Sequence, residues 1–357
     1  MGEIASVADL NWHYLGRAIK RGPSGSFDSD VTGDPCIVWD DEEQRYRMFY
    51  FAQTHTGDGS EVNCVANAVS AGRDLVGPGD WRKLGPVEYT NPESLHSGQA
   101  SKPWIVMDPR RPNRPATPDG SFWLLIVSWL DGSKVIQRAR APHLSGPWTL
   151  QVDPLLSPGE AGDFDALHAD TVTAYWFTEE GRVLLYYKGY PLHPQKEQPN
   201  SPWGSCLATA VMRVTDETAQ KLGPVLRPTT RSGHWLSGWV SSVQLVPRDA
   251  RGYWGLGSGS PTPPAPVSEQ PTMREPAPSL GGWLDTQESF PVTGWRPSEK
   301  PIVALDELPA AAVEDGMGTN LWRHHLLGPI DGRLYLFCNS GPYGQEQMFV
   351  RVATLSI

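Results

Sequence analysis

Five polar residues of types that can carry acid–base chemistry recur along the chain at nearly regular intervals. Asp34, Lys102, Asp170, Ser241 and Arg323 are separated by 68, 68, 71 and 82 residues. A carboxylate can accept a proton or attack an electrophilic carbon, whereas cations and hydroxyls can orient a polar substrate. The five residues therefore predict one polar pocket, on the condition that the fold brings the five stretches together.

Each of these residues opens a stretch that is typical of a β-hairpin. An apolar run, a short polar turn and a second apolar run follow one another, and the turns include Asp119-Gly120 and Asp331-Gly332. The spacing is a little longer than the roughly 40 to 50 residues of common propeller blades. We predict an all-β fold, a five-bladed β-propeller that forms a single domain over residues 1–357, with blades beginning near 34, 102, 170, 241 and 323.

Other segments predict how the blades are completed. Three stretches built around Trp81, Trp148 and Trp295 resemble outer strands, where a tryptophan can cover the seam between neighbouring blades. Residues 12–16 are expected to pair with residues 347–353 and so close the ring, because closure removes exposed strand edges. Few helices are expected, and 215–222 is one short candidate.

Composition narrows the classes of partner. The formal net charge of −10 and the absence of a basic run argue against a nucleic-acid groove. No window is long and apolar enough for a membrane span, and residues 1–15 do not resemble a signal peptide. We therefore expect a cytoplasmic location and a small-molecule or oligosaccharide substrate, with no nucleic acid or membrane partner. The oligomeric state stays open.

Cysteines and histidines give little sign of a metal or a disulfide. The four cysteines are far apart and lack CxxC spacing, which favours buried free thiols over a disulfide or a catalytic thiol. His324 and His325 are adjacent on a predicted strand, so their side chains point to opposite faces and do not readily share one ion. We expect that no cofactor is required; a structural ion in the central channel is the open alternative.

The starts of the innermost strands converge on the mouth of a propeller's channel. Aromatic rings, imidazoles and further polar groups lie near these starts, and such a mixture suits the CH faces and hydroxyls of a sugar. An alternative is that the polar groups cap the channel and bind water while the tryptophans pack between blades. The predicted substrate contacts are Lys102, Trp104, Asp165, His168, Trp239, Ser241, Arg323 and His324.

Two motifs carry a resemblance to a known group of enzymes. Residues 33–38, Gly-Asp-Pro-Cys-Ile-Val, followed by Tyr-Arg-Met-Phe-Tyr at 46–50, resemble the first blade of five-bladed glycoside hydrolases of families 43, 32, 68 and 117. The resemblance implies that Asp34 is the general base or the nucleophile. The His-Ala-Asp-Thr-Val of the third blade resembles the family 43 blade whose aspartate tunes and orients the acid. Asp170 matches that aspartate, and Asp165 is a neighbouring candidate.

One departure from the family pattern concerns the proton donor. Family 43 enzymes carry a general-acid glutamate near the start of the fourth blade, and residues 233–242 contain no glutamate. The resemblance to family 117 implies that His234 takes this role. Glu288, Glu346 or the complete absence of an acid are alternatives.

The sequence therefore predicts a glycoside hydrolase-like enzyme that acts on a furanosidic or similarly small sugar linkage through carboxylate chemistry in the central funnel. Two alternatives stay open. One is a non-hydrolytic cyclase or isomerase that uses the same pocket, and the other is a carbohydrate-binding propeller without turnover. A proline-rich run at 261–278 is either a lid over the funnel or a surface loop.

Overall fold

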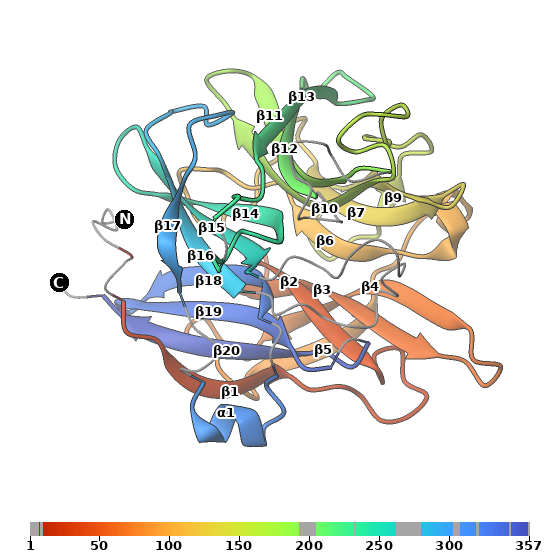
Figure 1. Cartoon of the computed structure of the whole chain (residues 1–357). Helices are drawn as coiled ribbons and strands as arrows, with labels where there is room; N and C mark the ends of the chain where they lie inside the picture. The colour runs from red at the N-terminus through yellow and green to blue at the C-terminus, as the bar shows by residue number, and fades with distance from the viewer. Residues whose placement is uncertain are drawn as a thin grey trace, which may run out of the picture.

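The computed structural model describes residues 7, 10–192, 205–231, 233–261, 280–302, 308–318, 321–342 and 344–355. Five antiparallel sheets of four strands each form a ring, which is the predicted five-bladed β-propeller (Figure 1). Nearly all of the proline-rich run at 261–278, for which both a lid and a surface loop were left open, lies outside the described residues.

The blades follow one another along the chain. Blade 1 contains β2 (Val31–Asp40), β3 (Arg45–His55), β4 (Glu61–Ser70) and β5 (Trp81–Pro86). Blade 2 contains β6 (Ser101–Ile105), β7 (Phe122–Leu130), β8 (Ser133–Ala141) and β9 (Thr149–Leu150). Blade 3 contains β10 (His168–Phe177), β11 (Arg182–Tyr190), β12 (Cys206–Met212) and β13 (Gln220–Leu226). Blade 4 contains β14 (Trp239–Pro247), β15 (Tyr253–Ser260), β16 (Leu280–Thr286) and β17 (Arg296–Pro301).

Blade 5 is completed by the two ends of the chain. It contains β18 (Trp322–Ile330), β19 (Arg333–Ser340), β20 (Gln347–Thr354) and β1 (His13–Ile19). The pairing of β1 with β20 confirms the predicted closure and is visible in Figure 1, where the two ends of the colour scale lie side by side. The short helix α1 (Ala310–Glu314) lies beside β1. Tyr14 of β1 donates a hydrogen bond to Asp315 at the end of this helix (2.6 Å).

Helix is scarce in the described chain. Besides α1 there are 3₁₀ turns at Pro92–Ser94 and His96–Gly98. The predicted short helix at 215–222 is wrong: the segment forms turns and then enters β13 at Gln220. Pairing with β12 supplies hydrogen bonds over several residues, and this outweighs the weak helical preference of so short a segment.

Tryptophans pack across the seams between blades, as the sequence predicts. The Trp81 ring lies 6.0 Å from that of Phe337 of blade 5, and Trp148 lies 5.8 Å from Phe49 of blade 1. Trp295 contacts Tyr186 of blade 3 at 6.1 Å. Each pair is close to edge-to-face, the favoured geometry for aromatic contacts.

Buried hydrogen bonds also join the inner strands around the whole ring. The inner strands β2, β6, β10, β14 and β18 lie near its centre (Figure 1). Each of the five seams has such a bond. Around the ring they run from Ile105 N to Cys36 Sγ, Trp104 Nε1 to Ala174 O, Thr173 Oγ1 to Val243 O, Gln244 Nε2 to Leu326 O, and Ile37 N to His325 Nε2. These bonds join each inner strand directly to the next, so the buried polar groups that form them have partners within the protein.

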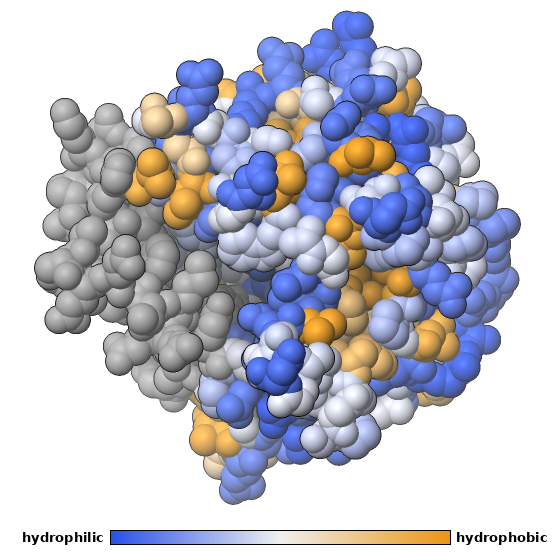
Figure 2. Space-filling view, turned by 90° about the vertical axis from the view of Figure 1, so that its right-hand side faces the viewer, coloured by the Kyte–Doolittle hydropathy of each residue, from blue (hydrophilic) through white to orange (hydrophobic). Residues whose placement is uncertain are grey.

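Remaining features of the fold agree with the composition. All four cysteines are free thiols. Within the described residues, no helix is long and apolar enough to cross a membrane. On the face shown in Figure 2, hydrophobic residues are scattered among hydrophilic ones rather than gathered into one broad patch.

Candidate active site

A β-bulge interrupts each inner strand near its start. At the bulges of blades 1, 2 and 5, Asp34, Lys102 and Arg323 adopt left-handed backbone conformations with φ of 51°, 51° and 54°. In blade 3 the bulge is shorter, and Thr171, next to Asp170, has the left-handed φ of 49°. Non-glycine residues in this region cost about 1–3 kcal/mol each and concentrate at functional sites, where a bulge redirects side chains.

Asp34 is held from two sides. Asn339 Nδ2 donates to Asp34 Oδ1 at 2.7 Å, and the Asp34 backbone N–H donates to Asn339 Oδ1 at 2.7 Å. Arg323 Nε lies 3.3 Å from the same Oδ1. Gly33 permits this contact, because a Cβ there would lie 2.7 Å from Asn339 Nδ2. The Asp34 carboxylate, only 4% exposed as a residue, is therefore fixed in position before any substrate arrives.

Asp170 is fully buried and paired with lysines. Lys102 Nζ lies 2.6 Å from both of its carboxylate oxygens, and Lys134 Nζ lies 3.2 Å from Oδ2. Burial alone raises the pKa of Asp170, but the charges of the two lysines outweigh it and hold the pKa well below its usual value. Burial lowers the pKa of Lys102 to about 8. Asp170 thus stays ionised and cannot itself act as the acid at neutral pH.

Glu346 is the buried carboxyl group with the properties of a proton donor. It lies between β19 and β20, is 5% exposed, and its backbone carbonyl accepts a hydrogen bond from Thr32 of blade 1. Burial, together with the charge of nearby Asp34, raises the pKa of Glu346 to about 7. At neutral pH this carboxyl group is therefore poised between its two protonation states beside Asp34.

The other two proposed acids lie in blade 4. His234 Nε2 lies 3.2 Å from the Ser298 carbonyl, and its Nδ1 accepts a hydrogen bond from the Leu236 N–H. Glu288 accepts a hydrogen bond from the hydroxyl of Thr293 in the connection from β16 to β17. In the described part of the chain, neither side chain hydrogen-bonds to Asp34 or Asp170.

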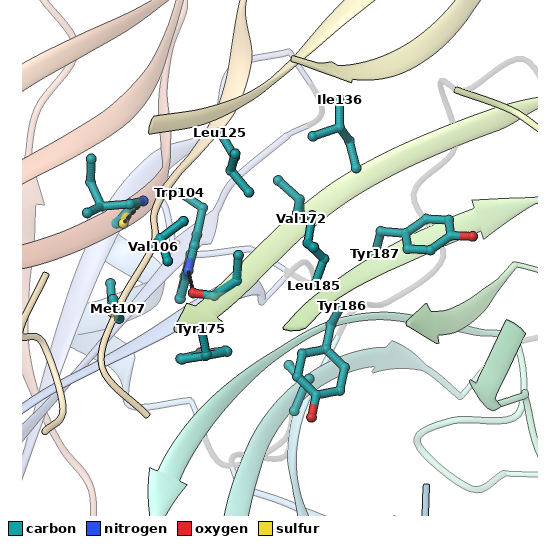
Figure 3. Close-up of a cluster of buried hydrophobic side chains, with 14 of the residues drawn as sticks. Trp104, Val106, Met107, Leu125, Ile136, Val172, Tyr175, Leu185, Tyr186 and Tyr187 are labelled. Carbon is teal, nitrogen blue, oxygen red and sulfur yellow. Dashed lines mark hydrogen bonds between the residues drawn. The ribbon is translucent and has the colours of Figure 1, made fainter. Parts of the chain in front are cut away.

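Two predicted substrate contacts are packed among protein groups. Trp104 is 2% exposed and lies beside Tyr175, with ring centres 6.1 Å apart, inside the hydrophobic cluster of Figure 3. His324 is buried against Gly281 and lies 3.1 Å from the Ser258 hydroxyl, and burial lowers its pKa to about 3. Through these contacts Trp104 and His324 link neighbouring blades.

Two further predicted contacts belong to blade 3. Asp165 Oδ2 accepts a hydrogen bond from Tyr187 (2.9 Å) and pairs with Lys221 (2.7 Å), which ties the chain before β10 to the sheet. His168 Nδ1 accepts a hydrogen bond from the Lys134 N–H, and burial lowers its pKa to about 4. Ser241 is at the blade 4 bulge and is 5% exposed.

Lys188 is a residue of the site that the sequence analysis did not single out. Lys188 lies opposite Asp170 in the register of β10 and β11, and it is 7% exposed. Its Nζ lies 4.1 Å from the ring centre of Trp239 and 4.5 Å from that of Tyr190. The sequence feature that could have identified Lys188 is the presence of a lysine within a largely apolar strand.

A separate hollow of about 410 Å³ lies where β1 leads into β2. It is lined mainly by polar and charged side chains, including Arg17, Lys20, Arg21 and Asp30, and by none of the predicted site residues. Among the residues that the structure describes, no three histidine, cysteine or acidic side chains are grouped as metal ligands.

Comparisons with known proteins find similarity in structure but not in sequence. No protein-family model matches the chain, and no curated protein is similar to it in sequence. Among solved structures it resembles a thermostable family-43 glycoside hydrolase (TM-score 0.61, 14% identity, 94% of this chain and 91% of that one). It also resembles an endo-arabinase from Bacteroides thetaiotaomicron (0.59, 12%, 94% and 98%) and the catalytic domain of the Coprinopsis cinerea family-62 α-L-arabinofuranosidase (0.57, 11%, 97% and 97%).

The solved structures it resembles are thus glycoside hydrolases of the five-bladed propeller type. At 11–14% identity, the likeness shows a shared fold. Assignment of chemistry depends on the site itself.

Proposed function

We propose that this protein is a glycoside hydrolase that cleaves a furanosidic or similarly small sugar linkage. The observation that carries the proposal is the proximity of two unlike carboxyl groups, Asp34 paired with Arg323 and Glu346 with a pKa raised to about 7. Acid–base catalysts commonly contain two titratable groups whose different surroundings push their pKa values apart. The arabinan-cleaving names among the structural neighbours support the furanosidic linkage.

Each carboxyl group has one role in the proposed reaction. Glu346 donates its proton to the glycosidic oxygen while the bond from that oxygen to the anomeric carbon breaks. Asp34 either removes a proton from the water that attacks the anomeric carbon or attacks that carbon itself. The separation of the reacting carboxyl groups distinguishes these routes, at about 6.5–9.5 Å for inversion and about 5–5.5 Å for retention.

Asp170 and its lysines support the site without exchanging the catalytic proton. The ionised Asp170 holds Lys102 at the left-handed bulge of β6 and partly compensates the positive charge in the funnel. This agrees with a modulating role for Asp170 and with Lys102 as a substrate contact. His234 becomes the less favoured acid, because its ring nitrogens engage blade 4.

The experiment that tests this proposal is turnover of a panel of nitrophenyl furanosides and pyranosides. The wild-type chain is compared with Asp34→Asn and with Asp153→Asn, the same isosteric change at an exposed site. Cleavage of at least one furanoside by the wild type and Asp153→Asn, with its loss in Asp34→Asn, is expected. Full activity of Asp34→Asn, or no cleavage of any substrate by the wild type, would contradict it.

A further inference from the structure

Lys188 has the features of an unoccupied anion-binding group. Its side chain is buried over the faces of Trp239 and Tyr190, and within the described residues its ammonium nitrogen has no hydrogen bond or ion pair. Contacts with ring faces attract a cation but leave its N–H donors unused. The donors are therefore available to an acceptor that enters the funnel.

Arg323 presents a second set of unused donors. The residue is 8% exposed, and only its Nε is directed at Asp34. Nη1 and Nη2 are buried and have no hydrogen-bond partner among the described residues. A buried donor without a partner is destabilising, and more so on a charged group, so a ligand that supplies oxygen acceptors would relieve this cost.

These two side chains belong to one electrostatic group. Arg323, Lys102 and Lys134 are all near enough that their charges lower the pKa of Lys188, while Asp170 acts in the opposite direction. The acidic members at the site are Asp170 and Asp34, with Glu346 poised near neutrality. Positive groups thus outnumber ionised carboxylates, which favours an anionic ligand over a neutral one.

We propose that the substrate of this enzyme is an acidic sugar whose carboxylate binds between Lys188 and Arg323. The inference rests on the proposed function, because it assumes that the funnel binds a sugar. The guanidinium of Arg323 offers two parallel N–H groups that match a planar carboxylate. Trp239 and Tyr190 place apolar ring faces beside Lys188, where the CH face of the sugar ring can pack.

The charges around Lys188 also bear on this binding mode. Burial, with help from the neighbouring cations Lys102, Lys134 and Arg323, lowers the pKa of Lys188 well below its usual value. A carboxylate beside Lys188 favours the charged form of its side chain and so acts against this shift.

Calorimetric titration of the full chain tests the proposal. Glucuronate and galacturonate are compared with glucose and galactose at pH 7, at low and at high salt. We expect at least one acidic sugar to bind about tenfold or more tightly than its neutral counterpart, and this preference should weaken at high salt.

Lys188→Met is the decisive variant. Methionine is apolar and packs well against aromatic rings, so thermal unfolding should show a folded protein of equal or higher stability. The variant should lose the preference for the acidic sugar while binding the neutral sugar as before. Lys300→Met, at an exposed position of the outer strand β17, should behave as the wild type.

Three results would overturn the inference. They are equal binding of every acidic and neutral pair, an unchanged preference in Lys188→Met, and binding of inorganic phosphate without any preference for an acidic sugar. Failure of the proposed function looks different: the acidic sugar binds through Lys188, yet no glycoside of that sugar is hydrolysed. Hydrolysis of neutral furanosides without a carboxylate preference would leave the function standing and remove this inference alone.

Discussion

Asp34 and Arg323 form an ion pair across the seam between blade 1 and blade 5, with Arg323 Nε 3.3 Å from Asp34 Oδ1. Both residues stand at bulges of inner strands and have left-handed φ angles. Blade 5 is completed by β1, which leads into β2 of blade 1 and pairs with β20. Assembly of the candidate site is therefore tied to closure of the whole propeller.

Replacing Asp34 tests this pair directly. Asp34→Asn keeps the shape of the side chain and an oxygen that can accept the Asn339 hydrogen bond, so the protein should fold. Turnover should fall by a factor on the order of 10²–10⁴, the usual range for loss of a positioned base. Steady-state kinetics beside circular dichroism checks both points, and a folded variant with wild-type turnover would remove Asp34 from the chemistry.

The raised pKa of Glu346 predicts a pH dependence of activity. A general acid must be protonated, so kcat/KM should fall as the pH rises above about 7, where Glu346 loses its proton. Glu346→Gln cannot donate that proton and should abolish this alkaline limb. It should also slow cleavage of substrates with basic leaving groups far more than cleavage of dinitrophenyl glycosides, whose leaving group needs little protonation.

His234→Gln is the matched comparison for Glu346→Gln. Because the His234 ring nitrogens engage blade 4, the substitution should leave the alkaline limb in place. If His234→Gln removes the limb and Glu346→Gln keeps it, the proton donor is the histidine that the sequence resemblance implies.

The fold could be predicted because it depends on patterns that repeat. Apolar runs and polar turns indicated the hairpins, and the outer-strand tryptophans indicated the seams that Trp81, Trp148 and Trp295 indeed cover. The adjacent histidines also point away from each other, as expected for neighbours on a strand: His324 contacts Ser258 of blade 4, whereas His325 contacts Ile37 of blade 1. Strand alternation fixes such directions without knowledge of the tertiary structure.

The site was harder to predict because burial and long-range contacts determine it. Asp34 and Lys102 stand out by position, yet nothing local distinguishes Glu346 from Glu288 as an acid. Only the tertiary structure shows that Glu346 is buried near Asp34 while Glu288 is bonded within its own loop. Lys188 was missed for the same reason, since its unusual surroundings include residues of three blades besides its own.

Breaking the buried pair of Lys102 and Asp170 should cost stability. Lys102→Met removes the closest partner of a fully buried carboxylate and leaves Lys134 at 3.2 Å, so we expect a loss of about 3 kcal/mol in the free energy of unfolding. Denaturant unfolding measures it, with Arg231→Gln as the control. Arg231 and Glu299 form an exposed pair, which contributes about 1 kcal/mol or less.

The double variant Lys102→Met with Asp170→Asn adds a further check. Removing the carboxylate's charge as well should recover part of the stability lost in Lys102→Met, because the isolated buried charge is the source of the cost. Strictly additive losses would show that Lys102 acts through packing rather than through its charge.

Buried histidines should make the protein sensitive to mild acid. Burial lowers the pKa of His324 and of His325 to about 3, whereas an unfolded histidine titrates near 6.5. Between these values the unfolded chain binds protons that the folded chain does not, so stability falls as the pH falls from about 6.5 towards 3. Each histidine should lower the free energy of unfolding at pH 5 by about 2 kcal/mol relative to neutral pH.

A single substitution isolates this contribution from other titrating groups. Glu346, with its raised pKa, acts in the opposite direction in the same range, so the total pH dependence mixes several residues. His324→Gln keeps a group that can bond the Ser258 hydroxyl and removes one titrating site. Denaturant unfolding at pH 7 and pH 5 should show a difference smaller by about 2 kcal/mol in His324→Gln than in the wild type. An unchanged difference would mean that the folded protein accommodates a protonated His324, and the buried contact with blade 4 would then have to open in acid.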